Sequence, residues 1–209
     1  MRNLVMSALL VGASLLGTTA VAQELVEGSN YITLSSPVPT TQTEKIEVVE
    51  LFWYGCPHCY QLEATINPWS AALPEDVKFV RIPAMFGGIW NVHGQLFITL
   101  ETLKVEEKVH SSIFDALHNS GRRLSSVDEI ANFVAEQGVD KELFMKTWNS
   151  FSVKSQMEKA KKLALAYQIS GVPAIVVNGK YRFDIGMAGG LQETVDVADA
   201  LIQKERQSK

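Results

Sequence analysis

The sequence predicts an α/β protein in which a strand–helix–strand unit and a later hairpin and helix flank a long helical block. Three observations predict it. Runs rich in β-branched and aromatic residues occur at 46–53 and 77–82. Apolar residues recur at helical spacing from about 91 to 167. Strand character returns at 174–183 around an Asn-Gly turn, which is typical of a hairpin.

The first 22 residues have the pattern of a secretory signal peptide. Arg2 precedes an apolar stretch at 4–16, and the small residues at 20–22 fit cleavage before Gln23. The alternative is an uncleaved membrane anchor, but a span needs about 20 apolar residues and this stretch is shorter. We therefore expect an exported protein that loses residues 1–22.

The remaining chain has the bulk properties of one soluble globular protein. About 190 residues are enough to bury a core without disulfides. A hydrophobic content of 46% and a charged content of 20% are ordinary for this class. The net charge is −4, and no basic run interleaved with aromatic residues occurs. Nucleic acid is therefore not an expected partner.

The strand at 46–53 leads directly into a cysteine motif, and a helix follows the motif. Its apolar stripe has spacings of four, three and four and consists of Leu62, Ile66, Trp69 and Leu73. Pro68 lies inside this stripe. Because an internal proline removes a backbone donor and clashes with the preceding turn, we expect a kink or a break there.

The helical block contains recognisable helix ends. Ser126 and Glu129 form a capping box, and Gly138 closes the helix that they open. Asp140 is suited to cap the next helix. Large apolar residues at helical spacing are expected in the core of the block: Phe133, Phe144 and Trp148. A last helix is predicted at 191–204.

The only two cysteines of the chain, Cys56 and Cys59, stand in one turn. An exported protein that uses disulfides for stability normally spreads them across the fold. Closing so small a ring removes little entropy from the unfolded chain, so this bond would stabilise the fold poorly. The pair is therefore predicted to serve chemistry rather than stability.

The residues between the cysteines predict which sulfur reacts. Pro57 suits the first position of a helix, which places Cys56 at the helix start, where unpaired N–H groups and the macrodipole favour a thiolate. Cys59 lies one turn deeper. His58 can help to stabilise the thiolate. In the alternative interpretation, His58 is an exposed helix residue without an electronic role. A stabilised thiolate makes the disulfide form a stronger oxidant.

Two other interpretations of a Cys-x-x-Cys motif fit less well. A closed zinc site needs four ligands, and His93, His110 and His118 lie in the helical block without a second ligand pair at the usual spacing. Haem attachment requires histidine at position 60, where this chain has tyrosine. We therefore expect no metal and no bound cofactor.

Glu50 interrupts an apolar strand at a position where strand periodicity would bury it. Because an unpaired buried carboxylate is costly, such a residue usually has a partner or a task. Glu63 and Arg81 are candidates to complete a network with it. Their alternative is an ordinary surface position, since charged side chains mostly face water.

The segments ELFWYGCPHCY at 50–60 and GVPA at 171–174, in this order around a helical block, resemble the DsbA family of periplasmic thiol:disulfide oxidoreductases. The resemblance extends over essentially the whole chain after the signal. It implies a thioredoxin-like fold with an inserted all-helical domain. The thioredoxin-like domain would comprise 23–88 and 165–209, and the insertion 89–164.

The resemblance also implies roles for individual residues. Cys56 would be the attacking cysteine and Cys59 the resolving one, joined in a redox-active disulfide. Glu50 would assist proton movement at the buried cysteine. Pro173 would be a cis residue facing the active site, with Val172 beside it to bind an extended substrate. From sequence alone, an ordinary trans proline is the alternative, because only about 5% of X-Pro bonds are cis.

The function that these implications give is a dithiol oxidase in the periplasm. It would pass its disulfide to newly exported, unfolded proteins with free cysteines. A DsbB-type quinone-linked membrane oxidase would reoxidise it. A reductase or isomerase is one alternative. Isomerases of this kind carry an extra dimerisation domain, and the segment before Ile46 is too short to form one. We therefore expect a monomer. A metal carrier or a peptide-holding chaperone is the other alternative.

Overall fold

The computed structural model describes residues 25–41 and 44–208, so the predicted signal peptide and its cleavage site lie outside the described residues. A mixed sheet forms the centre of the fold, with strand order β1-β5-β4-β2-β3. Only β2 and β3 are parallel, and the other neighbours are antiparallel. The strands are β1 (Ile32–Thr33), β2 (Ile46–Phe52), β3 (Val77–Pro83), β4 (Ala174–Val177) and β5 (Tyr181–Asp184).

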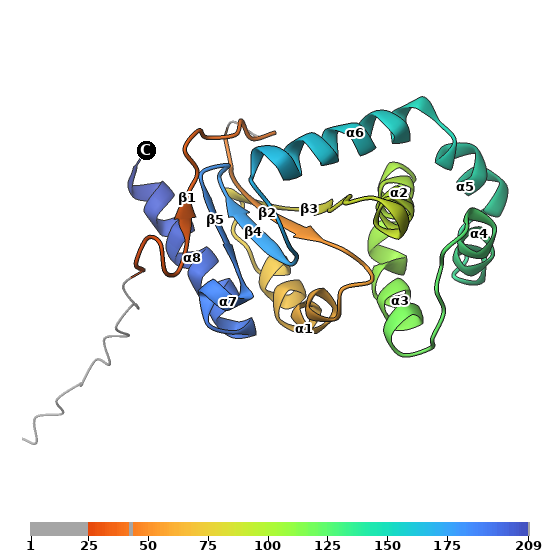
Figure 1. Ribbon diagram of the computed structural model, residues 1–209, viewed down its shortest axis with the longest axis horizontal. Helices are drawn as coiled ribbons and strands as arrows, with labels where there is room; N and C mark the ends of the chain where they lie inside the picture. Colours follow the sequence, from red (N-terminus) through yellow and green to blue (C-terminus); the bar gives the residue numbers. More distant parts are fainter. Residues whose placement is uncertain (1–24, 42–43, 209) are drawn as a thin grey trace, which may run out of the picture.

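Helices connect and cover these strands, and α2 to α5 lie together beyond one end of the sheet (Figure 1). Helix α6 leads back from this group to the sheet. None of the described helices is long and apolar enough to cross a membrane. The helices are α1 (Pro57–Ala71), α2 (Gly88–Thr102), α3 (Glu106–His118), α4 (Val127–Glu136), α5 (Lys141–Trp148), α6 (Phe151–Ala166), α7 (Ile185–Ala188) and α8 (Leu191–Gln207).

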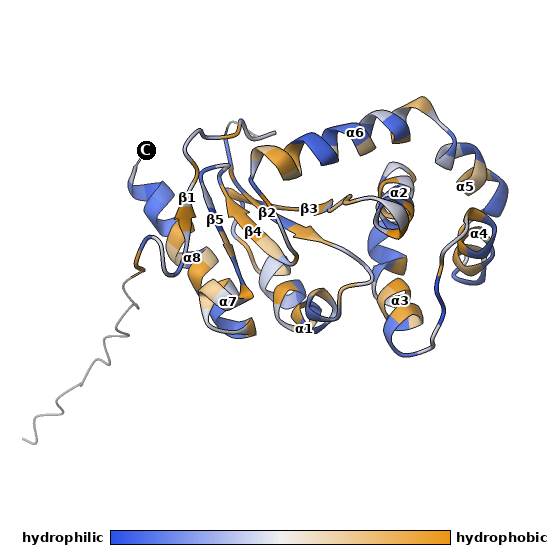
Figure 2. Cartoon of the chain, in the orientation of Figure 1, coloured by the Kyte–Doolittle hydropathy of each residue, from blue (hydrophilic) through white to orange (hydrophobic). Residues whose placement is uncertain are grey.

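The sheet has two buried faces, and β2 shows how its residues divide between them. Successive side chains of a strand point to opposite faces. Val48 packs with residues of α1 and α8, whereas Val49 packs in the core shared with α2 and α6. Glu50 is therefore directed to the α1 face. The strands β2 and β4 are mainly hydrophobic in Figure 2, as expected for strands covered on both sides.

The structure confirms most of the predicted elements. Ser126 Oγ accepts from the N–H of Glu129, and Asp140 accepts from the N–H of Leu143, so both predicted caps are present. The carboxylate of Glu129 caps the preceding loop at Leu124 and Ser125 rather than the N–H of Ser126. The predicted core residues of the helical block are buried: Phe133, Phe144 and Trp148.

We expected a kink or a break at Pro68, and the break is wrong, because α1 continues through this residue to Ala71. The kink stays a prediction. Pro68 lies in the last turn, so few helical residues follow it. The sequence analysis also missed β1 and α7, which have two and four residues. Elements this short contain only about one period of a hydrophobic pattern, which is too little to identify a repeat.

The proposed domain division stays a prediction. Its first boundary, between 88 and 89, falls at the start of α2. Its second boundary, between 164 and 165, falls in the last turn of α6, which ends at Ala166.

Candidate active site

The two cysteines lie at the N-terminal end of α1. Cys56 is the N-cap residue with an extended backbone, and Pro57 occupies the first turn. The backbone N–H of Cys59 donates to Cys56 Sγ over 3.4 Å. Both residues are free thiols in this structure. Cys56 is 7% exposed and Cys59 is fully buried, so one sulfur lies at the surface of the helix tip and the other beneath it.

The environment separates the proton affinities of the two thiols. A hydrogen bond from the Cys59 thiol, helped by the N–H groups of Cys59 and His58 and by the His58 charge, lowers the pKa of Cys56 to about 6. Burial, together with the adjacent Cys56 and Glu50, raises the pKa of Cys59 far above its ordinary value. At neutral pH, Cys56 is therefore a thiolate and Cys59 a thiol.

The loop before β4 lies against the cysteine pair, although the two segments are far apart in sequence. The Val172–Pro173 peptide bond is cis. The carbonyl oxygen of Val172 lies 3.5 Å from Cys56 Sγ, although the two residues are 116 positions apart. Val172 is half-buried and Pro173 is buried. His58 is exposed on the first turn of α1.

Glu50 lies under the cysteines as a buried carboxylate with one cationic partner. Its side chain is inaccessible to solvent, and Nε of Arg81 donates to Glu50 Oε2 over 3.0 Å. The other carboxylate oxygen, Oε1, has no hydrogen-bond partner. Arg81 also contacts Glu63 Oε1 over 3.4 Å and Asn67 Oδ1 over 2.5 Å. The structure therefore brings Glu50, Arg81 and Glu63 into one network.

The two carboxylates of this network have opposite proton affinities. Burial raises the pKa of Glu50 to about 7, against the opposing attraction of Arg81. For Glu63, burial acts in the same upward direction, but the close contact with His110 and its charge, together with Arg81 and Asn67, outweigh it and lower the pKa. Glu50 can therefore take up and release a proton near neutral pH, while Glu63 stays ionised.

The sequence analysis missed the far side of this network. His110 was considered only as a metal ligand, and Glu106 and Tyr54 were not considered. All three lie next to Glu63 or to one another. The spacing of Glu106 and His110, four residues apart on one helix, was the available signal.

Aromatic rings pack beside the active-site loop. Trp53 stacks on Trp90 with 4.1 Å between ring centroids, and Phe86 lies 5.1 Å from Trp90. Phe86 is 46% exposed. A side chain at Gly55 would collide with the Trp53 ring, so the absence of a Cβ there permits this packing. An apolar surface therefore adjoins the cysteine pair.

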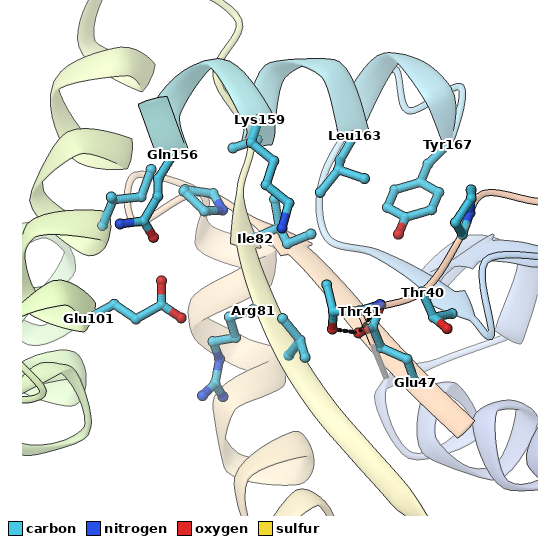
Figure 3. A pocket seen from close by; sticks show the side chains of 15 residues that line it. Thr40, Thr41, Glu47, Arg81, Ile82, Glu101, Gln156, Lys159, Leu163 and Tyr167 are labelled. Carbon is cyan, nitrogen blue, oxygen red and sulfur yellow. Dashed lines mark hydrogen bonds between the residues drawn. The ribbon is translucent and has the colours of Figure 1, made fainter. Parts of the chain in front are cut away.

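A cavity of about 570 Å³ lies on the other side of β3, beneath α6 (Figure 3). Lys159 and Leu163 reach it from α6, and Tyr167 reaches it from the end of this helix. Arg81 of the Glu50 network also lines the cavity, but neither cysteine does.

Fold and site together define a class of protein. A mixed sheet carries a Cys-x-x-Cys pair at the start of the helix that follows β2, and a cis proline precedes β4, the antiparallel neighbour of β2. The outer sulfur is held as a thiolate and the inner one as a thiol. This arrangement is that of a thioredoxin-fold thiol:disulfide oxidoreductase.

Comparisons with known proteins agree with this class. The family model of the DSBA-like thioredoxin domain matches residues 91–201. The thiol:disulfide interchange protein DsbA of Pseudomonas aeruginosa is 62% identical over 206 residues, which is 99% of this chain and 98% of that protein. The protein of the same name from Azotobacter vinelandii is 58% identical over 214 residues, with both chains fully covered.

Solved structures show the same similarity. The crystal structure of Pseudomonas aeruginosa DsbA has a TM-score of 0.85 and 64% identity, and the match covers 87% of this chain and 94% of that one. The oxidoreductase DsbA from Xylella fastidiosa has a TM-score of 0.81 at 33% identity, covering 87% and 98%. The chain belongs to the DsbA family. Its fold is the thioredoxin-like fold with a helical insertion, and its activity is thiol:disulfide exchange.

Proposed function

We propose that this enzyme acts as an oxidase that donates a Cys56–Cys59 disulfide to newly exported, unfolded proteins in the periplasm. The observation that carries the proposal is the opposite proton affinity of the two thiols. A stabilised Cys56 thiolate favours the reduced enzyme, so the oxidised enzyme gives up its disulfide readily. The apolar surface beside the loop supports binding of unfolded chains, which expose apolar side chains.

The exchange proceeds in two steps. A substrate thiolate attacks Cys56 Sγ, the Cys56–Cys59 bond breaks, and the Cys59 sulfur leaves as a thiolate that takes a proton from Glu50. A second substrate thiolate then attacks the substrate sulfur of the mixed disulfide, and Cys56 leaves as a thiolate. The substrate loses two electrons and the enzyme gains them. Val172, with its carbonyl facing the outer sulfur, offers backbone groups to which an extended substrate can pair.

Reoxidation reverses the proton movement. The Cys56 thiolate attacks the disulfide of a DsbB-type quinone-linked membrane oxidase, and Glu50 takes the proton of Cys59 so that this sulfur can close the bond. Within this scheme, Pro57 sets the helix start, and His58 and the N–H groups of the first turn hold the Cys56 charge.

Trapping of the mixed disulfide tests the roles of the two cysteines. In a Cys59→Ala variant, the attacking sulfur remains and the resolving sulfur is gone, so adducts with cellular proteins accumulate on a non-reducing gel. The matched variant Cys56→Ser forms none. Adducts on Cys59 in the second variant, or none in the first, would reverse the assignment.

The redox state of the pair in cells tests the direction of transfer. An oxidase is found mainly as the disulfide, and deletion of its membrane partner converts the pool to dithiol. A pool that is mainly reduced while the partner is present supports the reductase or isomerase alternative instead.

A further inference from the structure

The buried polar network continues past Glu63 to a histidine that the proposed exchange does not use. His110 is 4% exposed and comes from α3, in the helical insertion. Its Nε2 lies 3.2 Å from Glu63 Oε2, and its Nδ1 lies 2.6 Å from Glu106 Oε1. His110 Nε2 and Glu106 Oε1 have no hydrogen-bond partner among the described residues, so neither contact has the geometry of a hydrogen bond. The attraction is therefore mainly between charges. One imidazole thus faces carboxylates from two helices.

The surroundings of His110 are otherwise apolar. Rings from β2, α2 and α3 pack around it: Phe52, Phe97 and Phe114. The loop after β2 contributes the Tyr54 hydroxyl, 3.0 Å from Nδ1, and β3 contributes Arg81. The carboxylate of Glu101 on α2 acts on the Tyr54 hydroxyl. Charges in such a poorly solvated site interact more strongly than in water.

The two carboxylates decide the charge of the imidazole. Burial alone favours the neutral ring, but the carboxylates of Glu106 and Glu63 outweigh it and raise the pKa of His110 above its ordinary value. Among the described residues, no group of three or more histidine, cysteine, aspartate or glutamate side chains is placed to hold a metal ion.

The charge balance of the cluster depends on His110. Among the described residues, Arg81 is the permanent cation that pairs with Glu50 and Glu63, and the third carboxylate of the cluster, Glu106, pairs with His110. The other charged residues of the described chain that line the cavity beside the cluster are Lys45, Glu75, Lys78 and Glu107, and the structure shows no ion pair between them and the cluster. With an imidazolium present, the cluster is neutral when Glu50 is protonated and carries one negative charge when it is ionised. Without the imidazolium, ionisation of Glu50 adds a second negative charge to a cluster that already carries one, which is unfavourable at low dielectric.

We propose that His110 is a positioning residue of the redox reaction: its imidazolium, held between Glu63 and Glu106, supplies the second positive charge that allows Glu50 to exchange a proton with Cys59. This inference rests on the proposed role of Glu50. His110 touches neither cysteine and acts through Glu63 and Arg81. The inserted helical segment thereby takes part in the chemistry of the thioredoxin-like part.

The cluster also meets solvent on the side away from the cysteines. A cavity of about 590 Å³ lies there, and the cluster residues among its lining are Asn67, Arg81, Glu106 and His110. The imidazole and Glu106 therefore form part of the wall of this cavity, while the imidazole itself stays buried.

The carboxyl titration of Glu50 tests the inference without any measurement of activity. In the wild type, the carboxyl carbon resonance of Glu50 should titrate near pH 7. His110→Gln removes the charge and keeps a polar side chain, so the midpoint should rise by about one pH unit or more. The matched control is His93→Gln, because His93 is also buried but contacts the backbone oxygen of Arg123 rather than a carboxylate. Its Glu50 midpoint should equal the wild-type value.

A kinetic measurement separates this inference from the proposed function. With glutathione bound to Cys56, Cys59 gives its proton to Glu50, attacks Cys56 Sγ and releases glutathione thiolate. The rate of this release should rise with pH around the Glu50 midpoint and shift upward in His110→Gln. Glu50→Gln should lose the inflection. If Glu50→Gln keeps the inflection, the proposed role of Glu50 in proton transfer is wrong. The carboxyl titration still shows whether His110 lowers the pKa of Glu50.

Three outcomes would overturn the inference. The first is an unchanged Glu50 midpoint in folded His110→Gln. The second is an equal shift in His93→Gln, which would indicate a general structural response. The third needs no variant: nitrogen resonances of the His110 ring that report a neutral imidazole at pH 6 in the wild type. The third measurement keeps the inference testable if His110→Gln does not fold.

Discussion

The thiol of Cys59 is predicted to be the main stabiliser of the Cys56 thiolate, and a pair of substitutions isolates it. Cys59→Ala removes the S–H donor and leaves the backbone N–H groups and His58 in place. Cys59→Ser keeps a donor at the same position. The thiolate absorbance of Cys56, followed against pH in each reduced protein, gives its pKa directly.

The expected size follows from the energy of one hydrogen bond to a charged group. Such a bond contributes about 1.5–3 kcal/mol, and one pKa unit corresponds to about 1.4 kcal/mol. The pKa of Cys56 should therefore rise from about 6 to between about 7 and 8 in Cys59→Ala. At pH 7, the thiolate fraction would fall from about nine-tenths to between about one-half and one-tenth.

The serine variant decides how the result is interpreted. Cys59→Ser should titrate close to the wild type, because its hydroxyl donates to the same sulfur. An alanine variant that still titrates near pH 6 would refute the dominant role of the Cys59 thiol. A wild type in which Cys56 titrates at its ordinary value would refute the thiolate itself and, with it, the proposed direction of transfer.

Three further predictions concern stability. Burial raises the pKa of Glu50 from 4.5 to about 7, so its ionisation destabilises the fold as pH rises through this window. In urea titrations, Glu50→Gln should therefore raise the free energy of unfolding by about 3 kcal/mol at pH 8 and leave it unchanged at pH 4. The lowered pKa of Glu63 has the opposite sign, because its contribution is present above pH 4.5 and is lost as pH falls through the folded pKa. Glu63→Gln should therefore destabilise the protein at pH 7, and this loss should shrink as the pH falls below 4.5. A loss that does not change with pH would contradict the ion pairs. Gly55→Ala should displace the Trp53 ring from Trp90 and lower the free energy of unfolding by about 1–3 kcal/mol. The displacement should change the near-ultraviolet circular dichroism spectrum. The control is Gly171→Ala, which has open space around its Cβ position and should leave both the spectrum and the stability unchanged.

The sequence was sufficient for the parts of the site that depend on local structure. The position of Cys56 at a helix start follows from Pro57 and the preceding strand, both of which act within a few residues. The burial of Glu50 follows from strand periodicity in the same way. These features could be predicted because each is decided by neighbours in the chain.

The parts that could not be predicted depend on the packing of distant elements. Whether Arg81 faces Glu50 or water depends on the parallel register of β2 and β3, which pairs these two residues directly. The contact of His110 with Glu63 depends on how α3 lies against α1. Neither arrangement has a signature in local spacing, so for Glu63 and Arg81 a network and a surface position remained equally open.

The strand order has a consequence for when the enzyme becomes competent. The pair β2–β3 precedes the helical insertion in the chain, whereas β4, which pairs with β2, follows it. Val172 and the outer sulfur therefore meet only after nearly the whole chain is available. A chain that is synthesised from its N-terminus contains both cysteines early, before the segment around Val172 that lies against the outer sulfur. The order of the chain thus delays assembly of the complete site until synthesis is almost finished.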